Sequence, residues 1–167
     1  MTEQCQIDYP IIHVGMAERK TPQLVAAVSE LGGLATIDAG YMTSAVLEQE
    51  ILKVKARTSK SFSVNLYVPE SFSYKDEAVA AMNDFLTPYR PALNLEQPTI
   101  GDTDPSICDI LIDIVIQQHV WICSFTFGIP DEETINRLKA ADIVLIGSVT
   151  TGEEVKAVEA ASCGTRK

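Results

Sequence analysis

Four side chains able to contact a ligand stand where predicted strands end: Met16, Asn65, Thr126 and Ser148. The carboxyl ends of parallel strands meet at one edge of a sheet, so these residues are expected to ring a common pocket. The amide of Asn65 can both donate and accept hydrogen bonds, which suits the edge of a heterocycle such as a flavin or a nicotinamide. Simpler roles stay open for three of them: a strand-end amide, a β-branched strand residue and a core methionine.

Other catalytic signatures are absent from the sequence. It contains no GxGxxG, GxxxxGK[ST], HExxH or GxSxG motif, which removes the strongest phosphate, zinc and nucleophile signals. His13 lies within an apolar run, and His119 precedes a predicted strand at the end of the sheet that serves stability, so neither is favoured as a catalytic residue. The four cysteines are widely spaced without CxxC pairs, which predicts reduced thiols and no metal site.

Composition narrows the class of protein. The chain has 167 residues, 46% of them hydrophobic, and a net charge of −10, which is typical of one globular domain and unlike the basic footprint of a nucleic-acid binder. The first ten residues lack the features of a signal peptide, and the apolar runs are too short to span a bilayer. The sequence therefore predicts a cytoplasmic protein that binds neither nucleic acid nor membrane.

The elements that must position the four side chains form five strand-helix units. Apolar runs predict strands at residues 10–14, 34–37, 61–68, 120–128 and 143–149. Thr21 followed by Pro22 is a helix start, and further helices are predicted after Thr43, near residue 106, at Asp131 and after Thr151. Because the strands read as continuously apolar, we expect an all-parallel α/β sheet covered by helices. Spacing alone leaves two architectures open, an open doubly wound sheet and part of a (β/α)8 barrel.

One segment departs from this rhythm. Residues 70–100 hold an acidic start, a predicted helix at 75–86 and the sequence TPYRP, whose prolines are expected to end that helix and favour an extended return. We interpret the segment as an excursion over the strand-end face of a single domain, residues 1–167, with a solvated insertion as the alternative.

Four stretches are recognisable as motifs: the opening YPIIHVGMA with TPQLVAAVSELGGL and AGYM, then FSVNLYVP, then SFTFGIP, then RLKAADIVLIG. Taken in this order, they resemble the nitronate monooxygenase family, formerly called 2-nitropropane dioxygenases. The resemblance covers nearly the whole chain and implies an FMN-dependent TIM barrel, of which this chain would hold about five βα units. It also implies oxidation of alkyl nitronates by O2 to carbonyl compounds and nitrite.

The resemblance assigns roles to four residues. Gly15 and Met16 match the segment that lies against the flavin ring, and Asn65 matches a flavin-contacting asparagine. Thr126 stands where well-studied members carry a catalytic histidine in SFHFG. A threonine cannot act as a general base at neutral pH, so a role for Thr126 would be hydrogen bonding or shaping the substrate site.

The sequence departs from the family pattern at three places. His13 replaces a usual glutamine, and Glu18 replaces a small residue beside the expected flavin face. The chain also stops before the glycine-rich turns that hold the FMN phosphate in the family. We therefore expect weak or no FMN binding by the isolated chain and self-association through an open sheet edge. The alternatives are a truncated, non-catalytic chain and a relative of the FMN-type enoyl-acyl-carrier-protein reductases.

Overall fold

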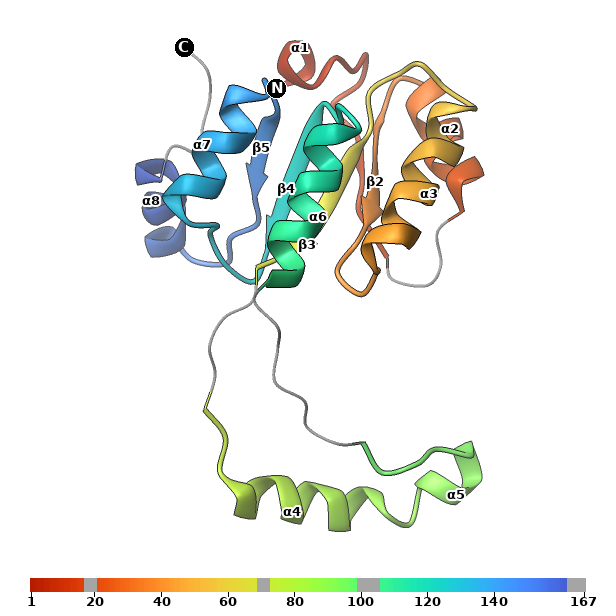
Figure 1. Ribbon diagram of the computed structural model, residues 1–167, viewed down its shortest axis with the longest axis vertical. Helices are drawn as coiled ribbons and strands as arrows, with labels where there is room; N and C mark the ends of the chain where they lie inside the picture. Colours follow the sequence, from red (N-terminus) through yellow and green to blue (C-terminus); the bar gives the residue numbers. More distant parts are fainter. Residues whose placement is uncertain (17–20, 69–72, 99–105, 162–167) are drawn as a thin grey trace. The chain divides into compact units, whose positions relative to one another are not determined.

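Five parallel strands form one sheet in the sequential order β1-β2-β3-β4-β5 (Figure 1). The computed structural model describes residues 1–16, 21–68, 73–98 and 106–161. The strands are β1 (Ile12–His13), β2 (Leu34–Asp38), β3 (Ser63–Tyr67), β4 (Ile122–Thr126) and β5 (Val144–Gly147). β2 is one residue longer than the run predicted for it. The other four strands are shorter than their predicted runs, because the ends of those runs lie in connecting turns.

The strand order decides between the two architectures. A doubly wound sheet reverses direction at a switch point, whereas here every crossover moves to the next strand in the same sense. Parallel strands joined by right-handed crossovers that never reverse place their helices on one face, which is the arrangement of a (β/α)8 barrel. The prediction of a partial TIM barrel with five parallel strands is confirmed.

Among the described residues, capping side chains begin four of the five main helices, as their sequence predicts. These helices are α2 (Pro22–Glu30), α3 (Ser44–Lys55), α6 (Ser106–Gln117), α7 (Glu132–Ala140) and α8 (Gly152–Ala160). The side chains of Thr21, Thr43, Asp131 and Thr151 each accept a hydrogen bond from the backbone N–H three residues later. Such a bond satisfies one of the donors that a helix start leaves open, and it typically stabilises the helix by about 1 kcal/mol.

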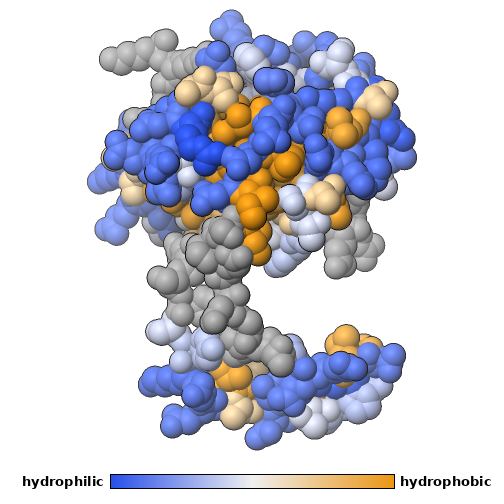
Figure 2. Space-filling view, in the orientation of Figure 1, coloured by the Kyte–Doolittle hydropathy of each residue, from blue (hydrophilic) through white to orange (hydrophobic). Residues whose placement is uncertain are grey.

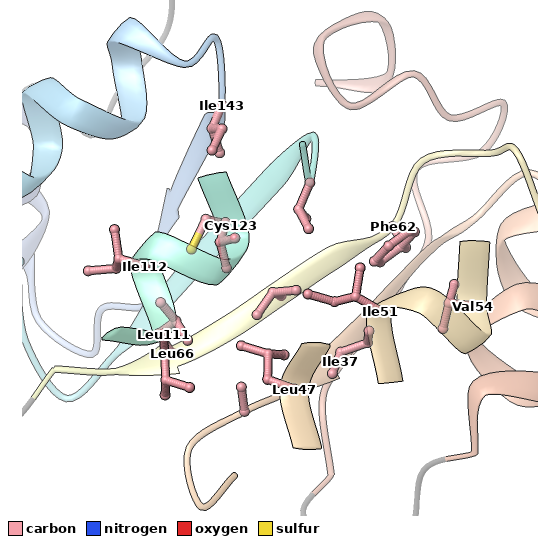
Figure 3. Close-up of a cluster of buried hydrophobic side chains, with 14 of the residues drawn as sticks. Ile37, Leu47, Ile51, Val54, Phe62, Leu66, Leu111, Ile112, Cys123 and Ile143 are labelled. Atoms are coloured by element: carbon pink, nitrogen blue, oxygen red, sulfur yellow. The ribbon is translucent and has the colours of Figure 1, made fainter. Parts of the chain in front are cut away.

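The main core lies between the sheet and its helices (Figure 3). Val64 and Leu66 of β3 and Phe125 of β4 pack there with Leu47 and Ile51 of α3. The residues that alternate with these along β3 and β4 face away from this core. A continuously apolar pattern was expected, but β3 and β4 alternate, because their second face carries polar residues near the carboxyl ends.

A second, smaller apolar cluster closes the amino-terminal end of that other face. It consists of Cys5, Ile7, Leu34 and Ile122, with Val144 and Ile146 packed against it. Cys5 belongs to α1 (Thr2–Cys5), a short helix that the sequence did not predict. Along β4 this face therefore changes from the apolar Ile122 at the amino-terminal end to the polar Ser124 and Thr126 at the carboxyl-terminal end.

Residues Glu70–Asp104 form a separate compact unit. It contains α4 (Asp76–Leu86), close to its predicted bounds, and α5 (Arg90–Leu93). The expected extended return is wrong at α5, since Pro91 lies in the first turn of that helix, where a missing N–H leaves no bond unmade. That this unit covers the strand-end face stays a prediction.

The surface of the larger unit is mostly hydrophilic, with a band of hydrophobic residues over α6 (Figure 2). Ile107 and Ile110 of that helix are about half exposed. Within the described ranges, no helix combines the length and the apolar character that crossing a bilayer requires.

Candidate functional site

Polar side chains gather at the carboxyl ends of β2, β3 and β4, on the face of the sheet away from the helices. Strand register aligns Asp38 with Asn65, and Asn65 with Ser124. Tyr67 and Thr126 are aligned in the same way two residues further along. Side chains two residues apart on a strand share a face, so these five residues form two adjoining layers. We call them the strand-end cluster.

Asn65 lies at the centre of the strand-end cluster. Its Oδ1 accepts hydrogen bonds from Ser124 Oγ and from Thr126 Oγ1, both at 3.0 Å. Its Nδ2 donates to Asp38 Oδ1 at 3.3 Å. The amide therefore joins three neighbouring strands, and both predicted residues, Asn65 and Thr126, are brought together by a direct hydrogen bond.

Asp38 is the charged member of the strand-end cluster and is buried, with 8% of its surface exposed. Besides the bond from Asn65, its carboxylate takes part in a side-chain hydrogen bond with Tyr67. The pKa of Tyr67 is raised above its ordinary value by burial first, then by the charge of Asp38, by Tyr41 and by that hydrogen bond. Tyr67 therefore stays a neutral phenol that donates its proton towards Asp38.

An aromatic group stands over the outer layer of the strand-end cluster. The ring of Tyr67 meets Tyr41 edge-on at 5.4 Å and Phe127 edge-on at 4.9 Å between centroids. Gly40 leaves the room that the Tyr67 ring occupies, because a Cβ built at Gly40 would lie 2.2 Å from the ring. Exposed faces of Tyr41 and Phe127 make this end of the sheet suitable for a flat aromatic ligand.

The remaining predicted residues lie further from Asn65. Gly15 and Met16 follow β1, two strands away in the sheet, and Met16 is 54% exposed. Ser148 follows β5 and is exposed, with its backbone N–H bonded to the carbonyl of Phe125. Glu18 lies outside the described residues. Of the four residues expected to surround one pocket, Asn65 and Thr126 are in direct contact. Met16 and Ser148 lie beyond the ends of the outer strands β1 and β5.

His13 belongs to a different environment. It is paired in register with Ala35, which lies in the helix-side core. Its Nδ1 is buried without a hydrogen-bond partner among the described residues. Along the parts of the chain that the structure describes, no three His, Cys, Asp or Glu side chains are grouped as metal ligands.

A large apolar hollow runs along β5. It has a volume of about 960 Å3 and is lined by Ile12 of β1, by Val144 and Ile146 of β5, and by Val155 and Val158 of α8. It therefore touches both edge strands of the sheet. Residues of the strand-end cluster do not line it, so the hollow and the polar site are separate features.

Sequence reasoning missed three members of the strand-end cluster, Asp38, Ser124 and Tyr67. Asp38 ends a buried strand, and a carboxylate in that position is a signal that could have been used, because a buried charge needs partners. Ser124 and Tyr67 lie two residues from Thr126 and Asn65, so the period of a strand places them on the same face.

Comparisons with known proteins agree with this geometry. A sequence model described as nitronate monooxygenase matches residues 1–164. A probable nitronate monooxygenase from Staphylococcus aureus (strain Newman) is 48% identical over 161 residues, which are 96% of this chain and 45% of that protein. The corresponding protein of Staphylococcus haemolyticus (strain JCSC1435) is 50% identical over 159 residues, 95% of this chain and 44% of its own length.

Solved structures give the same picture. The nitroalkane oxidase from Streptomyces ansochromogenes superposes with a TM-score of 0.88 at 33% identity, over 96% of this chain and 45% of that one. FabK from Thermotoga maritima superposes with a TM-score of 0.70 at 28% identity, over 96% of this chain and 40% of that one. The chain thus spans less than half the length of the relatives it matches.

Proposed function

This chain belongs to the nitronate monooxygenase family, and from that premise we propose that its strand-end cluster is the ring-binding side of an FMN site. The proposed reaction is the oxidation of alkyl nitronates by O2 to carbonyl compounds and nitrite. When bound, the flavin would supply the electron transfer from nitronate to oxygen. The cytoplasmic location expected from composition is part of this proposal.

The observation that carries the proposal is the Asn65 hydrogen-bond network. A flavin ring presents both acceptors and an N–H donor along its pyrimidine edge, and it needs complementary polar atoms on a mostly apolar floor. The strand-end cluster provides amide and hydroxyl groups within one layer. Tyr67 and Phe127 provide aromatic surface beside them. These residues therefore fit the ring of the cofactor.

The residues of the chain would act by binding and orienting. Asn65 is held from two sides, so its free amide hydrogen has a fixed direction towards a ligand. Gly15 and Met16, as the family resemblance implies, would lie against the ring from β1. Thr126, whose hydroxyl hydrogen is donated to Asn65, would shape the substrate side of the ring and would not remove a proton, because a threonine hydroxyl does not ionise near neutral pH.

A titration with two flavins tests the proposal. Riboflavin and FMN carry the same ring, and only FMN carries a phosphate. We expect both to bind the purified chain weakly and with affinities within about threefold of each other, because the strand-end cluster holds no cation for a phosphate. Quenching of flavin fluorescence on addition of protein, checked by equilibrium dialysis, measures both affinities.

A pair of matched variants locates the ring. Asn65→Leu removes the central amide and should weaken riboflavin binding by about tenfold or more, the effect of losing one or two hydrogen bonds. Asn136→Leu makes the same change at an exposed position of α7 and should leave binding unchanged. Absence of riboflavin binding by the unmodified chain, or equal binding by both variants, would overturn the proposal.

The apolar hollow supports a second proposal, which concerns assembly. We propose that the chain associates with a second copy through its open sheet edges. Ile146 and Val144 line the hollow on β5, and an edge strand with apolar surface beside it favours pairing with another chain. Ile146→Lys should shift the chain from dimer towards monomer in sedimentation velocity. Ile107→Lys on the outer face of α6 is the control and should not. A monomer at all concentrations would contradict this proposal.

An enoyl reductase function is the weaker alternative. The structure of an enoyl reductase domain from Bacillus amyloliquefaciens superposes with a TM-score of 0.60 at 12% identity. A likeness at this level of identity concerns the fold alone. The higher agreement with nitroalkane oxidase favours nitronate oxidation.

A further inference from the structure

The hydrogen bonds of the strand-end cluster all point in one direction. Ser124 and Thr126 donate to Asn65, and Asn65 donates to Asp38. Tyr67 donates to Asp38 from the other side. The donor-to-acceptor direction of each hydrogen bond in the network therefore leads towards the buried carboxylate of Asp38. A cluster built this way shows oxygen lone pairs, and few protons, to a ligand.

The carboxylate decides which way the Asn65 amide faces. Rotating the amide by half a turn would place its Oδ1 against Asp38 Oδ1, where the two oxygens would repel each other at the present separation of 3.3 Å. It would also turn Nδ2 towards Ser124 and Thr126, which would then have to accept. With an ionised Asp38 only the first orientation is satisfied on both sides.

This orientation changes what each group can offer a ligand. Asn65 Oδ1 already accepts two hydrogen bonds, so its acceptor capacity is used. The amide that was expected both to donate and to accept can therefore only donate. Ser124 and Thr126 donate their hydroxyl hydrogens to Asn65 in hydrogen bonds. The lone pairs on their hydroxyl oxygens therefore remain to accept a hydrogen bond from a ligand.

We propose that Asp38 is a positioning residue that fixes the orientation of Asn65 and so makes Thr126 and Ser124 hydrogen-bond acceptors for an N–H group of a neutral ring. The inference rests on the proposed flavin site and extends it to the direction of each hydrogen bond. It assigns the ring a polarity: an N–H faces the hydroxyls, and a neighbouring carbonyl faces the remaining hydrogen of Asn65.

Two neutral rings without phosphate test this polarity. Lumiflavin carries a hydrogen on N3, and 3-methyllumiflavin carries a methyl group there. We expect the purified chain to bind lumiflavin about tenfold more tightly, the usual effect of one hydrogen bond that only one ligand can make. The quantity of interest is the ratio of the two affinities, since a loss of structure would weaken both ligands alike.

Variants connect the ratio to Asp38. Asp38→Asn allows either orientation of Asn65 and should reduce the ratio to about threefold or less, the part due to the size of the methyl group. Thr126→Val removes one of the two proposed acceptors and should lower the ratio, whereas Thr126→Ser keeps the hydroxyl and should keep the ratio. Asp84→Asn, the same change at an exposed position of α4, should match the unmodified chain. Circular dichroism confirms that each variant is folded.

The outcomes separate the inference from the function on which it rests. A ratio that is the same in the unmodified chain and in Asp38→Asn overturns the role of Asp38 and leaves the ring site in place. A ratio near one in the unmodified chain overturns the assigned polarity. Failure of the unmodified chain to bind either ring removes the flavin site itself, and the inference with it.

Discussion

Gly40 offers a sharp test of how the Tyr67 ring is held. A positive φ does not explain this glycine, since its backbone lies outside that region. The reason for a glycine is space: an added Cβ would stand 2.2 Å from Tyr67 Cε2 and 2.4 Å from two further ring atoms. Ordinary contact begins near 3.4 Å, so Gly40→Ala requires a displacement of about 1.2 Å.

The size of the effect follows from the surroundings of the ring. Inserting a methyl group into a packed site typically costs about 1–3 kcal/mol. Tyr41 and Phe127, which flank the ring, are largely exposed and can yield. We therefore expect Gly40→Ala to lower the free energy of unfolding by about 1–2 kcal/mol, the lower part of that range. Urea denaturation followed by circular dichroism measures this difference.

A double-mutant cycle identifies the cause. In a Tyr67→Ala background the clash is gone, and Gly40→Ala should change the free energy of unfolding by less than about 0.5 kcal/mol. Gly152→Ala is the matched control, because a Cβ at Gly152 meets nothing within 4 Å. It should be neutral or stabilising by up to about 1 kcal/mol, since alanine favours a helix over glycine. Equal destabilisation by Gly40→Ala in both backgrounds would refute the explanation from Tyr67.

Three further predictions follow from burial and charge. Leu66→Ala should lower the free energy of unfolding by about 2–5 kcal/mol in urea denaturation, because Leu66 is fully buried, while Leu93→Ala at an exposed position should change it by less than about 0.5 kcal/mol. Asp38→Asn should lower the pKa of Tyr67, because the charge of Asp38 raises it. The pKa is measured by absorbance titration of the chain with Asp38 and of the chain with Asn at that position, after subtraction of the same titration of each chain carrying Tyr67→Phe. An unchanged pKa would contradict the contact between Asp38 and Tyr67. Burial, Asp109 and Asp131 raise the pKa of the Cys108 thiol from 9.0 to about 11, so its alkylation at pH 8 should be about 100-fold slower in the folded than in the unfolded chain by peptide mass spectrometry. The protonated thiol is favoured by folding, so its contribution to stability is complete below pH 9 and is lost as the pH rises towards 11.

The order of the elements could be predicted from sequence because its signals are local. Buried strands are short apolar runs, and the caps Thr21, Thr43 and Thr151 stand immediately before their helices. The short helices α1 and α5 were missed, since four residues carry too little periodicity to detect. The choice between barrel and doubly wound sheet depended on the strand order, which depends on contacts between distant residues.

The candidate site could be predicted only in part, for a similar reason. Asn65 and Thr126 were found because each ends a recognisable strand. Their hydrogen bonds depend on Asp38, which lies 27 residues before Asn65 in the sequence and on the next strand in the sheet. A side chain that can both donate and accept has no fixed role until its neighbours are known. The residue types were therefore predictable, whereas the direction of the bonds was not.

The segment Asp38–Tyr41 explains the position of Tyr67 from three of its four residues. Asp38 interacts with the phenol, Gly40 leaves space for the ring, and Tyr41 meets the ring edge-on. A substitution at any of the three should therefore move the Tyr67 ring. Its effect on ligand binding should depend on the new position of that ring and on how many hydrogen bonds of Asn65 are retained.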